Sequence, residues 1–379
     1  MPQRVMIIAG EASGDMHACE LVRQVHRKES DVEFYGIGGD NMRAAGVETL
    51  VDASELAVVG LIEVIAHRKI IFAALHKMQS LLQSKRPDLL ILVDYAEFNL
   101  KLAKTAKDLG VKVLFYISPQ VWAWRQKRVY KIKQRVDMMA VIFPFEADFY
   151  REYDVPVEYV GHPLIGKVTA SSTRDEFLLA NKLKSEHTVV GIFPGSRKSE
   201  IKRLLPILIK SAHLVHLHDK SIQFVLPVAA TLDVTLILPY IDNCPFPVKI
   251  IKGNTYDVIN ACDTIMTVSG TVTLEIALMH TPFVIINKLS WLSYFLVKRM
   301  IKITYIGLCN IVMNREVAKE FIQSQASPAN IAKEIIKLID NREYYNTQKS
   351  NLQKVEGKLT DKEITMKVGD VVLTMLNND

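Results

Sequence analysis

Short apolar runs alternate with amphipathic segments along most of the chain. In the first half these runs lie at 4–9, 34–37, 89–93, 111–117 and 138–143; in the second half they lie at 189–193, 222–226, 248–251, 264–268 and 282–287. Runs of this length without polar alternation are typical of parallel strands that are buried on both faces. The pattern therefore predicts an α/β protein with two similar doubly wound sheets, each covered by helices.

The rhythm is interrupted between residues 161 and 187, where Gly161, Pro163 and Gly166 precede a run of Ser and Thr. Glycine and proline at this density mark loops. We expect a first domain at 1–166 and a second at 167–340, which suits a chain of 379 residues. The polar, helix-like tail at 341–379 would pack back on the first domain or on a second copy of the chain, as in a homodimer.

Composition narrows the partners and the compartment. The net charge of +6 admits phosphates and anionic lipids, but the chain has no zinc-type spacing or basic tail that would indicate nucleic acid. The cysteines are scattered, as expected of reduced thiols in the cytoplasm. No apolar run approaches the ~20 residues that span a bilayer, and no signal-peptide pattern begins the sequence, so we expect membrane contact to be peripheral.

The first candidate for chemistry is Asp94, which directly follows the apolar run at 89–93. Ligands of open α/β sheets bind beyond the carboxyl ends of the strands, so this carboxylate could accept a proton from an attacking hydroxyl. A helix cap or a buried anchor is the alternative interpretation. For the nearby Glu97, a place at a helix start suits the charge better.

A turn with two glycines follows the first strand at residues 10–15. Glycine permits a tight turn, and the N–H groups at a helix start can hold a phosphate. Four residues of this turn form the predicted phosphate loop for the acceptor: Glu11, Ser13, Gly14 and Asp15. A plain capped turn, with Ser13 or Asp15 as the cap, is the alternative. The spacing differs from G-x-G-x-x-G, which argues against a nicotinamide cofactor, and we expect no cofactor.

Two further turns are predicted to bind a nucleoside diphosphate in the second domain. Gly195, Ser196 and Arg197 follow one strand, and the arginine could neutralise phosphate oxygens. The other strand ends in a stretch that begins with Ser269, Gly270 and Thr271 and reaches Glu275 one turn later. A helix start and a carboxylate one turn apart suit the diphosphate and the ribose diol. A surface arginine and an ordinary capped helix are the alternatives.

Two segments are candidates for a lipid surface. Trp122 and Trp124 precede a basic stretch that continues to Lys133. Packed aromatic side chains with a solvated basic face are the alternative for this segment. Residues 61–82 form a helical pattern whose apolar surface is wider than one buried stripe needs and is interleaved with basic residues. The predicted contacts are Ile62, Val64, Ile65, Arg68 and Phe72. A helix buried between the domains is the alternative, and 291–300 is a weaker second candidate.

Taken together, four motifs resemble those of the lipid-A-disaccharide synthase family. They are Gly-Glu-Ala-Ser-Gly-Asp at 10–15, Ser-Pro-Gln-Val-Trp-Ala-Trp at 118–124, Pro-Gly-Ser-Arg at 194–197 and Ser-Gly-Thr-Val-Thr-Leu-Glu at 269–275. The resemblance covers about the first 330 residues. It implies a GT-B fold and an inverting, metal-independent transfer of diacylglucosamine from its UDP derivative to diacylglucosamine 1-phosphate, with a β(1→6) linkage formed. It also implies a place at the cytoplasmic face of the inner membrane.

The resemblance also assigns roles to single residues. Asp94 matches the family's essential aspartate, Arg197 an arginine important for activity, and Asn310 the asparagine of a Leu-Pro-Asn motif, which implies a nucleotide contact. Two segments depart from the family pattern. Asp-Tyr-Ala-Glu-Phe-Asn at 94–99 replaces Asp-Ala-Pro-Asp-Phe-Asn, and Cys309 replaces the motif's proline.

Two other functions remain open from the sequence. A UDP-sugar epimerase of similar build would need further acid and base groups but no lipid-facing helix. A nucleotide-sugar-binding protein without catalysis would not need Asp94. His162 stands alone near the boundary, and the sequence contains no persuasive Ser-His-Asp arrangement or metal-ligand cluster.

Overall fold

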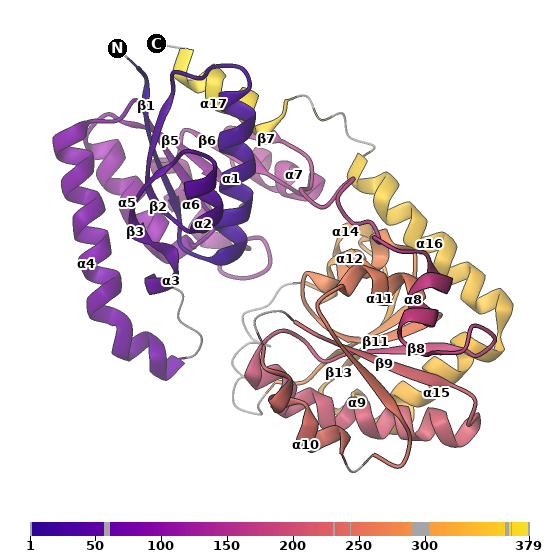
Figure 1. Ribbon diagram of the computed structural model, residues 1–379. Coiled ribbons are helices and arrows are strands. Elements are labelled where there is room, and N and C mark those ends of the chain that lie inside the picture. The colour runs from indigo at the N-terminus through magenta and orange to yellow at the C-terminus, as the bar shows by residue number, and fades with distance from the viewer. Residues whose placement is uncertain are drawn as a thin grey trace. The chain divides into compact units, whose positions relative to one another are not determined.

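The computed structural model describes residues 2–56, 61–229, 232–242, 244–289, 303–360, 364 and 366–377, with the backbone alone for 61–68. The chain divides into two compact units (Figure 1). Unit 1 is Met1–Pro163 together with Lys362–Asp379, and unit 2 is Leu164–Asp361. Unit 1 thus ends at Pro163, within the glycine- and proline-containing stretch at 161–187, and it includes the C-terminal segment.

The described part of unit 1 is built on a parallel sheet of seven strands in the order β3-β2-β1-β4-β5-β6-β7. The strands are β1 (Arg4–Ala9), β2 (Glu33–Gly38), β3 (Glu48–Asp52), β4 (Leu89–Val93), β5 (Lys112–Tyr116), β6 (Met138–Val141) and β7 (Val157–Tyr159). The connecting helices are α1 (Ala12–His26), α2 (Asp40–Ala44), α3 (Ala53–Leu56), α4 (Leu61–Lys85), α5 (Ala96–Asp108), α6 (Val129–Arg135) and α7 (Pro144–Glu152), with a 3-10 turn η1 (Gln126–Arg128).

Both faces of this sheet are buried, as the continuous apolar runs require. Met6 and Ile8 of β1 belong to a core that also contains Met78 and Leu82 of α4. Side chains alternate between the faces of a strand, and Ile7, which lies on the opposite face, is equally inaccessible. A doubly covered parallel sheet is therefore the reason that the strands of the sequence appear as unbroken hydrophobic runs.

The described part of unit 2 repeats the plan with six parallel strands in the order β10-β9-β8-β11-β12-β13. The strands are β8 (Val189–Phe193), β9 (Gln223–Val228), β10 (Val248–Lys252), β11 (Thr264–Val268), β12 (Phe283–Asn287) and β13 (Lys319–Ile322). The helices are α8 (Arg174–Ala180), α9 (Lys198–His218), α10 (Leu238–Ile241), α11 (Thr255–Ala261), α12 (Val272–Leu278), α14 (Leu308–Met313), α15 (Pro328–Asp340) and α16 (Arg342–Thr360), with 3-10 turns η2 (Val234–Leu236) and η3 (Gln323–Gln325).

The polar tail is shared between the two units. α16 packs on α12, α14 and α15, and its Gln348 exchanges two hydrogen bonds with the backbone of Phe283. The last helix, α17 (Val368–Asn377), lies against α1 in unit 1 (Figure 1), where Gly369 N donates to Gln24 Oε1 at 3.2 Å. The tail is thus two helices with separate attachments. All four cysteines are free thiols.

Candidate functional site

In both units the candidate residues lie where the strand order reverses. β1 and β4 are neighbours in unit 1, with Ala9 opposite Val93, and β8 and β11 are neighbours in unit 2, with Phe193 opposite Thr267. Such a switch point is where open α/β sheets bind ligands, beyond the carboxyl ends of the strands. The turns predicted from sequence follow these four strands, so each unit gathers its own set of candidate residues.

Asp94 leaves β4 in an unusual backbone conformation. Its φ is 48°, and Tyr95 follows with φ 43°, so two successive non-glycine residues occupy the left-handed region. Asp94 N donates to the carbonyl oxygen of Tyr116 in β5 at 3.1 Å. Asn99 Nδ2 donates to the carbonyl oxygens of Asp94 and Val93, at 2.7 and 3.2 Å. The turn is therefore fixed from the neighbouring strand and from the first turn of α5.

The surroundings of Asp94 raise the pKa of its carboxyl group. Burial raises the pKa of Asp94 to about 6, and the negative charge of Glu11 contributes to the rise. The two residues follow neighbouring strands of the sheet. A carboxyl group with a pKa near neutrality combines ionisation at physiological pH with useful basicity.

The turn after β1 does not have the form of the alternative interpretation, in which Ser13 or Asp15 caps the helix that follows. α1 already begins at Ala12, and Glu11 occupies the N-cap position without a side-chain cap. Asp15 therefore lies in the first turn of α1, where the backbone makes its own helical bonds. Of the four predicted loop residues, Glu11 and Ser13 are exposed, while Gly14 and Asp15 are buried.

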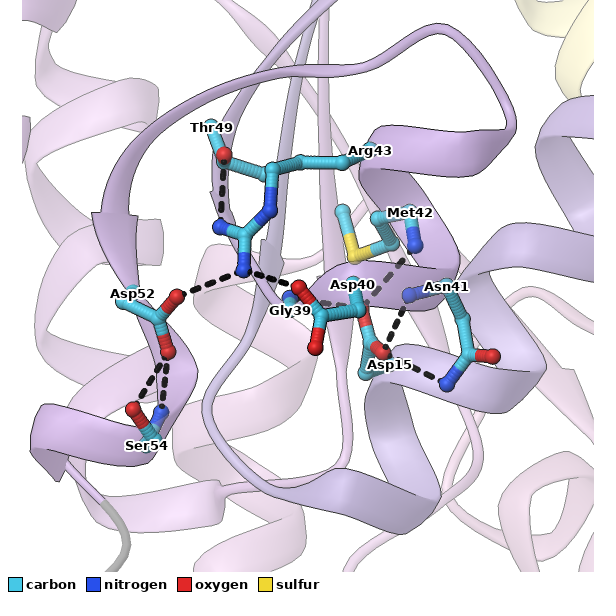
Figure 2. Close-up of polar contacts among 9 residues, drawn as sticks. All are labelled: Asp15, Gly39, Asp40, Asn41, Met42, Arg43, Thr49, Asp52 and Ser54. Atoms are coloured by element: carbon cyan, nitrogen blue, oxygen red, sulfur yellow. Dashed lines mark hydrogen bonds and ion pairs between the residues drawn. The ribbon is translucent and has the colours of Figure 1, made fainter.

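Asp15 serves a different helix (Figure 2). Its carboxylate accepts bonds from Gly39 N at 2.6 Å, Met42 N at 3.2 Å, and Asn41 N and Nδ2 at 3.1 and 2.8 Å. Three of these donors are backbone N–H groups at the start of α2, which have no partner within the helix, and an anion satisfies them well. The structure thus corrects the expected ligand role of Asp15, because its carboxylate is already used to hold α2 against the turn.

Figure 2 also shows how α2 is tied to β3. Arg43 of α2 donates to Asp40 at 2.6 Å and to Asp52, at the end of β3, at 2.7 Å. Asp52 in turn accepts two bonds from Ser54, and these bonds hold the pKa of Asp52 at about 2. This exposed network therefore supports the fold beside the turn at residues 10–15, called the Gly10 turn below.

A buried acid that the sequence did not single out lies at the same edge of the sheet. Glu146 of α7 accepts a bond from Trp122 Nε1 at 3.0 Å and from Phe143 N at 3.2 Å. Burial raises the pKa of Glu146 to about 8, and the charge of Asp94 adds to the rise. In the sequence, Pro-Phe-Glu at 144–146 has the pattern of an ordinary helix start. It therefore does not indicate that Glu146 is buried against Trp122.

Other contacts hold the tryptophan-containing loop and the segment after β7. Ser118 Oγ and Tyr150 Oη are 2.7 Å apart. The ring of His162 lies 4.9 Å from that of Phe143, and burial lowers the pKa of His162 to about 3. His162 is therefore neutral at physiological pH, as a packed structural histidine would be.

The Gly195 turn of unit 2 already contains an anion. Gly195 has φ +98°, in the region that favours glycine. The Glu200 carboxylate accepts bonds from Ser196 N and Arg197 N at 3.1 and 3.2 Å, and from Arg197 Nη1 at 2.9 Å. These two backbone N–H groups are thus occupied by Glu200, while the Arg197 guanidinium is exposed and has five N–H donors.

The turn after β11 has the predicted form. α12 begins after Thr271, and Ser269 Oγ donates to the carbonyl oxygen of Ile306 at 3.0 Å. Glu275 lies one turn on and is half-buried. It accepts a bond from Tyr256 Oη at 3.2 Å, and burial raises its pKa. No atom of the described residues lies within 4 Å of the position that a Cβ of Gly270 would occupy.

Asn310 is placed differently from the expectation. Its side chain is inaccessible. Its Oδ1 accepts from Val317 N and Ala318 N at 2.7 and 3.0 Å, and its Nδ2 donates to Ala318 O and Glu320 Oε1, both at 2.8 Å. Because these bonds engage both polar atoms of the amide, we correct the expected nucleotide contact. Asn310 thus ties α14 to Ala318 and to Glu320 of β13, and Glu320 in turn accepts bonds from Ile306 N and Gly307 N.

The two candidate membrane segments are described in part. Leu75, Met78 and Leu82 of α4 are buried, whereas Ile70 and Phe72 are 42% and 43% exposed. The side chains of the other predicted contacts, Ile62, Val64, Ile65 and Arg68, lie outside the described residues, as does 291–300.

In the tryptophan segment, Trp122 is buried and Trp124 is exposed, with the Arg125 guanidinium 4.7 Å from the Trp124 ring centre. Glu97 accepts a hydrogen bond from Arg128 and lies 3.6 Å from Arg125.

Two other features are absent from the described residues. No group of three or more His, Cys, Asp or Glu side chains there is placed to hold a metal ion. No helix there combines the length and the apolar character needed to cross a membrane.

Known sequences match this chain over most of its length. A family model described as lipid-A-disaccharide synthetase matches residues 5–369. The lipid-A-disaccharide synthase of Trichlorobacter lovleyi is 49% identical over 375 residues, which cover 99% of this chain and 98% of the relative. The lipid-A-disaccharide synthase of Nitrosococcus oceani is 50% identical over 355 residues, covering 94% and 92%.

Comparison with solved structures confirms the expected GT-B architecture. The UDP-GlcNAc 2-epimerase of Neisseria meningitidis, bound to UDP-GlcNAc, superposes with a TM-score of 0.65 at 11% identity, covering 99% of this chain and 100% of the other. MurG of Acinetobacter baumannii gives a TM-score of 0.55 at 12% identity, covering 99% of each chain. At such identities the likeness concerns the fold alone.

Proposed function

This chain belongs to the lipid-A-disaccharide synthase family, and we propose that it transfers diacylglucosamine from UDP-2,3-diacylglucosamine to 2,3-diacylglucosamine 1-phosphate. The family match extends over nearly the whole chain, with close relatives of the same length. The chain is accordingly a glycosyltransferase of lipid A synthesis. The products are UDP and the β(1→6)-linked disaccharide 1-phosphate, as the resemblance of the motifs also implied.

The observation that carries the mechanism is the position and pKa of Asp94. It follows β4 at the switch point of unit 1, and its pKa is raised to about 6. We propose that its carboxylate takes the proton of the acceptor hydroxyl while the hydroxyl oxygen attacks C1 of the donor sugar. The bond between C1 and the diphosphate breaks on the opposite face, UDP leaves with the electron pair, and the configuration at C1 is inverted. A general base contributes roughly 10²–10⁴-fold.

The nucleotide is assigned to unit 2. Glu275 is half-buried and has a carboxylate that can accept two bonds from a ribose diol, while Tyr256 orients it. Arg197 supplies a charged guanidinium for the diphosphate. The segments with Gly195, Ser196, Ser269, Gly270 and Thr271 lie at the same switch point, between β8 and β11. In this proposal Arg197 and the α12 turn stabilise the leaving UDP without a metal ion.

The remaining assignments concern the acceptor and the membrane. We assign the acceptor phosphate to the Gly10 turn, in which Glu11 and Ser13 are exposed and Asp15 ties the turn to the start of α2. Both substrates carry acyl chains, which favours a peripheral place at the cytoplasmic face of the inner membrane. A homodimer built with the C-terminal tail remains part of the proposal.

Product analysis tests this function against its alternatives. Mass spectrometry should detect the disaccharide 1-phosphate and UDP only when UDP-diacylglucosamine and the monosaccharide acceptor are both present. An epimerase would convert the donor alone into an isomer, and a binding protein would leave both substrates intact. Either of these last results would overturn the proposal.

A further inference from the structure

The turn that presents Asp94 is strained and needs support from outside itself. Asp94 and Tyr95 both adopt left-handed backbone angles, φ 48° and 43°. A residue with a Cβ seldom occupies this region, and a bulky one such as tyrosine still less often. Two such residues in succession persist only where the surrounding contacts determine the conformation, and such strain gathers at functional sites.

Asn99 supplies contacts on both sides of this turn. Its side-chain Nδ2 donates to the carbonyl oxygens of Val93 and Asp94, and its backbone N donates to the carbonyl oxygen of Tyr95 at 3.1 Å. One residue thus holds the last carbonyl of β4 and the two that follow. Because the Asp94 carbonyl and carboxylate share one Cα, fixing the peptide plane also fixes the direction of the Asp94 Cα–Cβ bond, from which the carboxylate extends.

The environment of Asn99 indicates that its side chain does more than fill space in the core. Its side chain is inaccessible, and its Oδ1 has no hydrogen-bond partner among the described residues. A buried polar atom without a partner is destabilising. An apolar side chain would avoid this cost but would abandon the carbonyl groups of Val93 and Asp94. The half-satisfied amide is therefore retained for its two donated bonds.

We propose that Asn99 is a positioning residue, which holds the backbone of the Asp94 turn so that the Asp94 carboxylate is directed at the acceptor hydroxyl. This inference rests on the proposed role of Asp94 as the base. It assigns Asn99 no contact with substrate. A base displaced by about 1 Å can lose roughly 10²-fold in rate, so the loss should appear in kcat and leave the binding of either substrate nearly unchanged.

The first test is Asn99→Ala in the full-length enzyme. We expect kcat to fall roughly 10–100-fold, while the KM of each substrate stays within about twofold. Gln79→Ala is the matched control, because Gln79 Nε2 donates to Thr105 Oγ1 of the same helix α5 at 2.9 Å without touching the turn. It should keep the wild-type kcat. Asn99→Ala with a kcat within about twofold of wild type would overturn the inference.

A rescue experiment separates positioning from general support of the fold. Glycine adopts the left-handed region without steric cost. Adding Tyr95→Gly to Asn99→Ala should therefore raise kcat at least threefold, whereas Tyr95→Gly in the wild type should not raise kcat. Absence of any recovery would overturn the inference. Should Asn99→Ala fail to fold, Asn99→Ser, which leaves a smaller void and keeps a hydroxyl donor, is measured in the same two backgrounds against the same criteria.

The Asp94 role is tested separately, so the two failures can be distinguished. If Asp94→Asn retains near-normal turnover, the proposed function of Asp94 fails, and the inference fails with it. If Asp94→Asn is inactive but Asn99→Ala turns over normally, the inference alone fails.

Discussion

The carboxylate of Glu200 holds both the backbone N–H and the guanidinium of Arg197, at 3.2 and 2.9 Å. The same carboxylate accepts a bond from Ser196 N, so a single acid orders the whole turn after β8. An arginine that is already oriented loses less freedom when it meets a diphosphate. Arg197 is 66% exposed on its side chain, however, so solvent screens the pair and its own contribution to stability is small.

The first prediction concerns this pair. Arg197→Ala should weaken UDP binding roughly tenfold, because a charged hydrogen bond is worth about 1.5–3 kcal/mol before screening. Glu200→Gln should weaken it less, roughly twofold to threefold, since the guanidinium remains but loses its charged partner. Isothermal titration with UDP measures both. Glu176→Gln is the matched control, because Glu176 closes the same kind of capping box at Thr173 with no arginine at the cap. Wild-type affinity in Arg197→Ala would contradict the assignment.

The second prediction concerns the base. Asp94→Asn keeps the size of the side chain and removes the proton acceptor, so turnover should fall roughly 10²-fold or more while UDP affinity changes little. Steady-state kinetics and UDP titration of the same preparation provide the two measurements. Near-normal turnover would remove Asp94 from this role.

The third prediction follows from the pKa of Asp94. A base works in its deprotonated form, so with a pKa of about 6 the value of kcat/KM should fall as pH drops below about 6 and level off above it. Glu11→Gln removes a neighbouring negative charge, which lowers the pKa of Asp94 and should move this acid limb to lower pH. The readout is the position of the limb in a pH–rate profile. An acid limb that stays at the same pH, or moves to higher pH, would show that Glu11 does not raise the pKa of Asp94.

The fourth prediction concerns the ribose. Glu275→Ala should weaken UDP binding roughly tenfold or more, because two charge-assisted bonds to the diol are lost. Tyr256→Phe removes the bond that orients Glu275 and should have a smaller effect in the same direction. Glu316→Ala is the control, since Glu316 forms a surface pair with Lys319. Equal UDP affinity in Glu275→Ala and in the control would place the ribose elsewhere.

Strand ends were the most predictable part of this molecule. Strands buried on both faces leave unbroken apolar runs in the sequence, and β1, β4, β8 and β11 begin and end as predicted. Their ends carry the candidate residues, so Asp94 and Glu275 could be singled out in advance. By contrast, β3, β7 and β13 are outermost strands of their sheets and lack such runs, and the sequence pattern did not reveal them.

The residues that escaped sequence reasoning act through contacts distant in the chain. Asp15 was assigned to a ligand because its hydrogen-bond donors, the N–H groups of α2, lie 24 to 27 residues away in the sequence. Glu146 accepts a hydrogen bond from Trp122, which is 24 residues away in the sequence. The motif that contains Asn310 does not reveal that the Asn310 side-chain amide bonds to the backbone after α14. Local pattern identifies which strand ends carry chemistry. It does not tell which polar side chains there face a ligand and which hold the backbone.

The last prediction concerns membrane attachment through α4. Extracting an acylated substrate from a bilayer costs about 0.8 kcal/mol per CH₂, so docking at the surface avoids most of that cost. Ile70 and Phe72 are both exposed on α4, and Lys101 lies 5.0 Å from the Phe72 ring centre, which adds a cation next to the apolar group. Replacing Ile70 and Phe72 together by Ser should therefore release the protein from anionic vesicles without unfolding it, because neither side chain is part of the core.

Sedimentation with vesicles measures this release, and circular dichroism checks the fold. Leu214→Ser with Leu217→Ser is the matched control, because both leucines are exposed on α9 of unit 2, 38% and 59%, and the pair should leave vesicle binding intact. Raising the salt concentration should weaken wild-type binding only in part, since salt screens the charges while apolar burial persists. If the α4 variant sediments as the wild type does, this helix is not the membrane contact. If the control is released instead, the contact lies on unit 2.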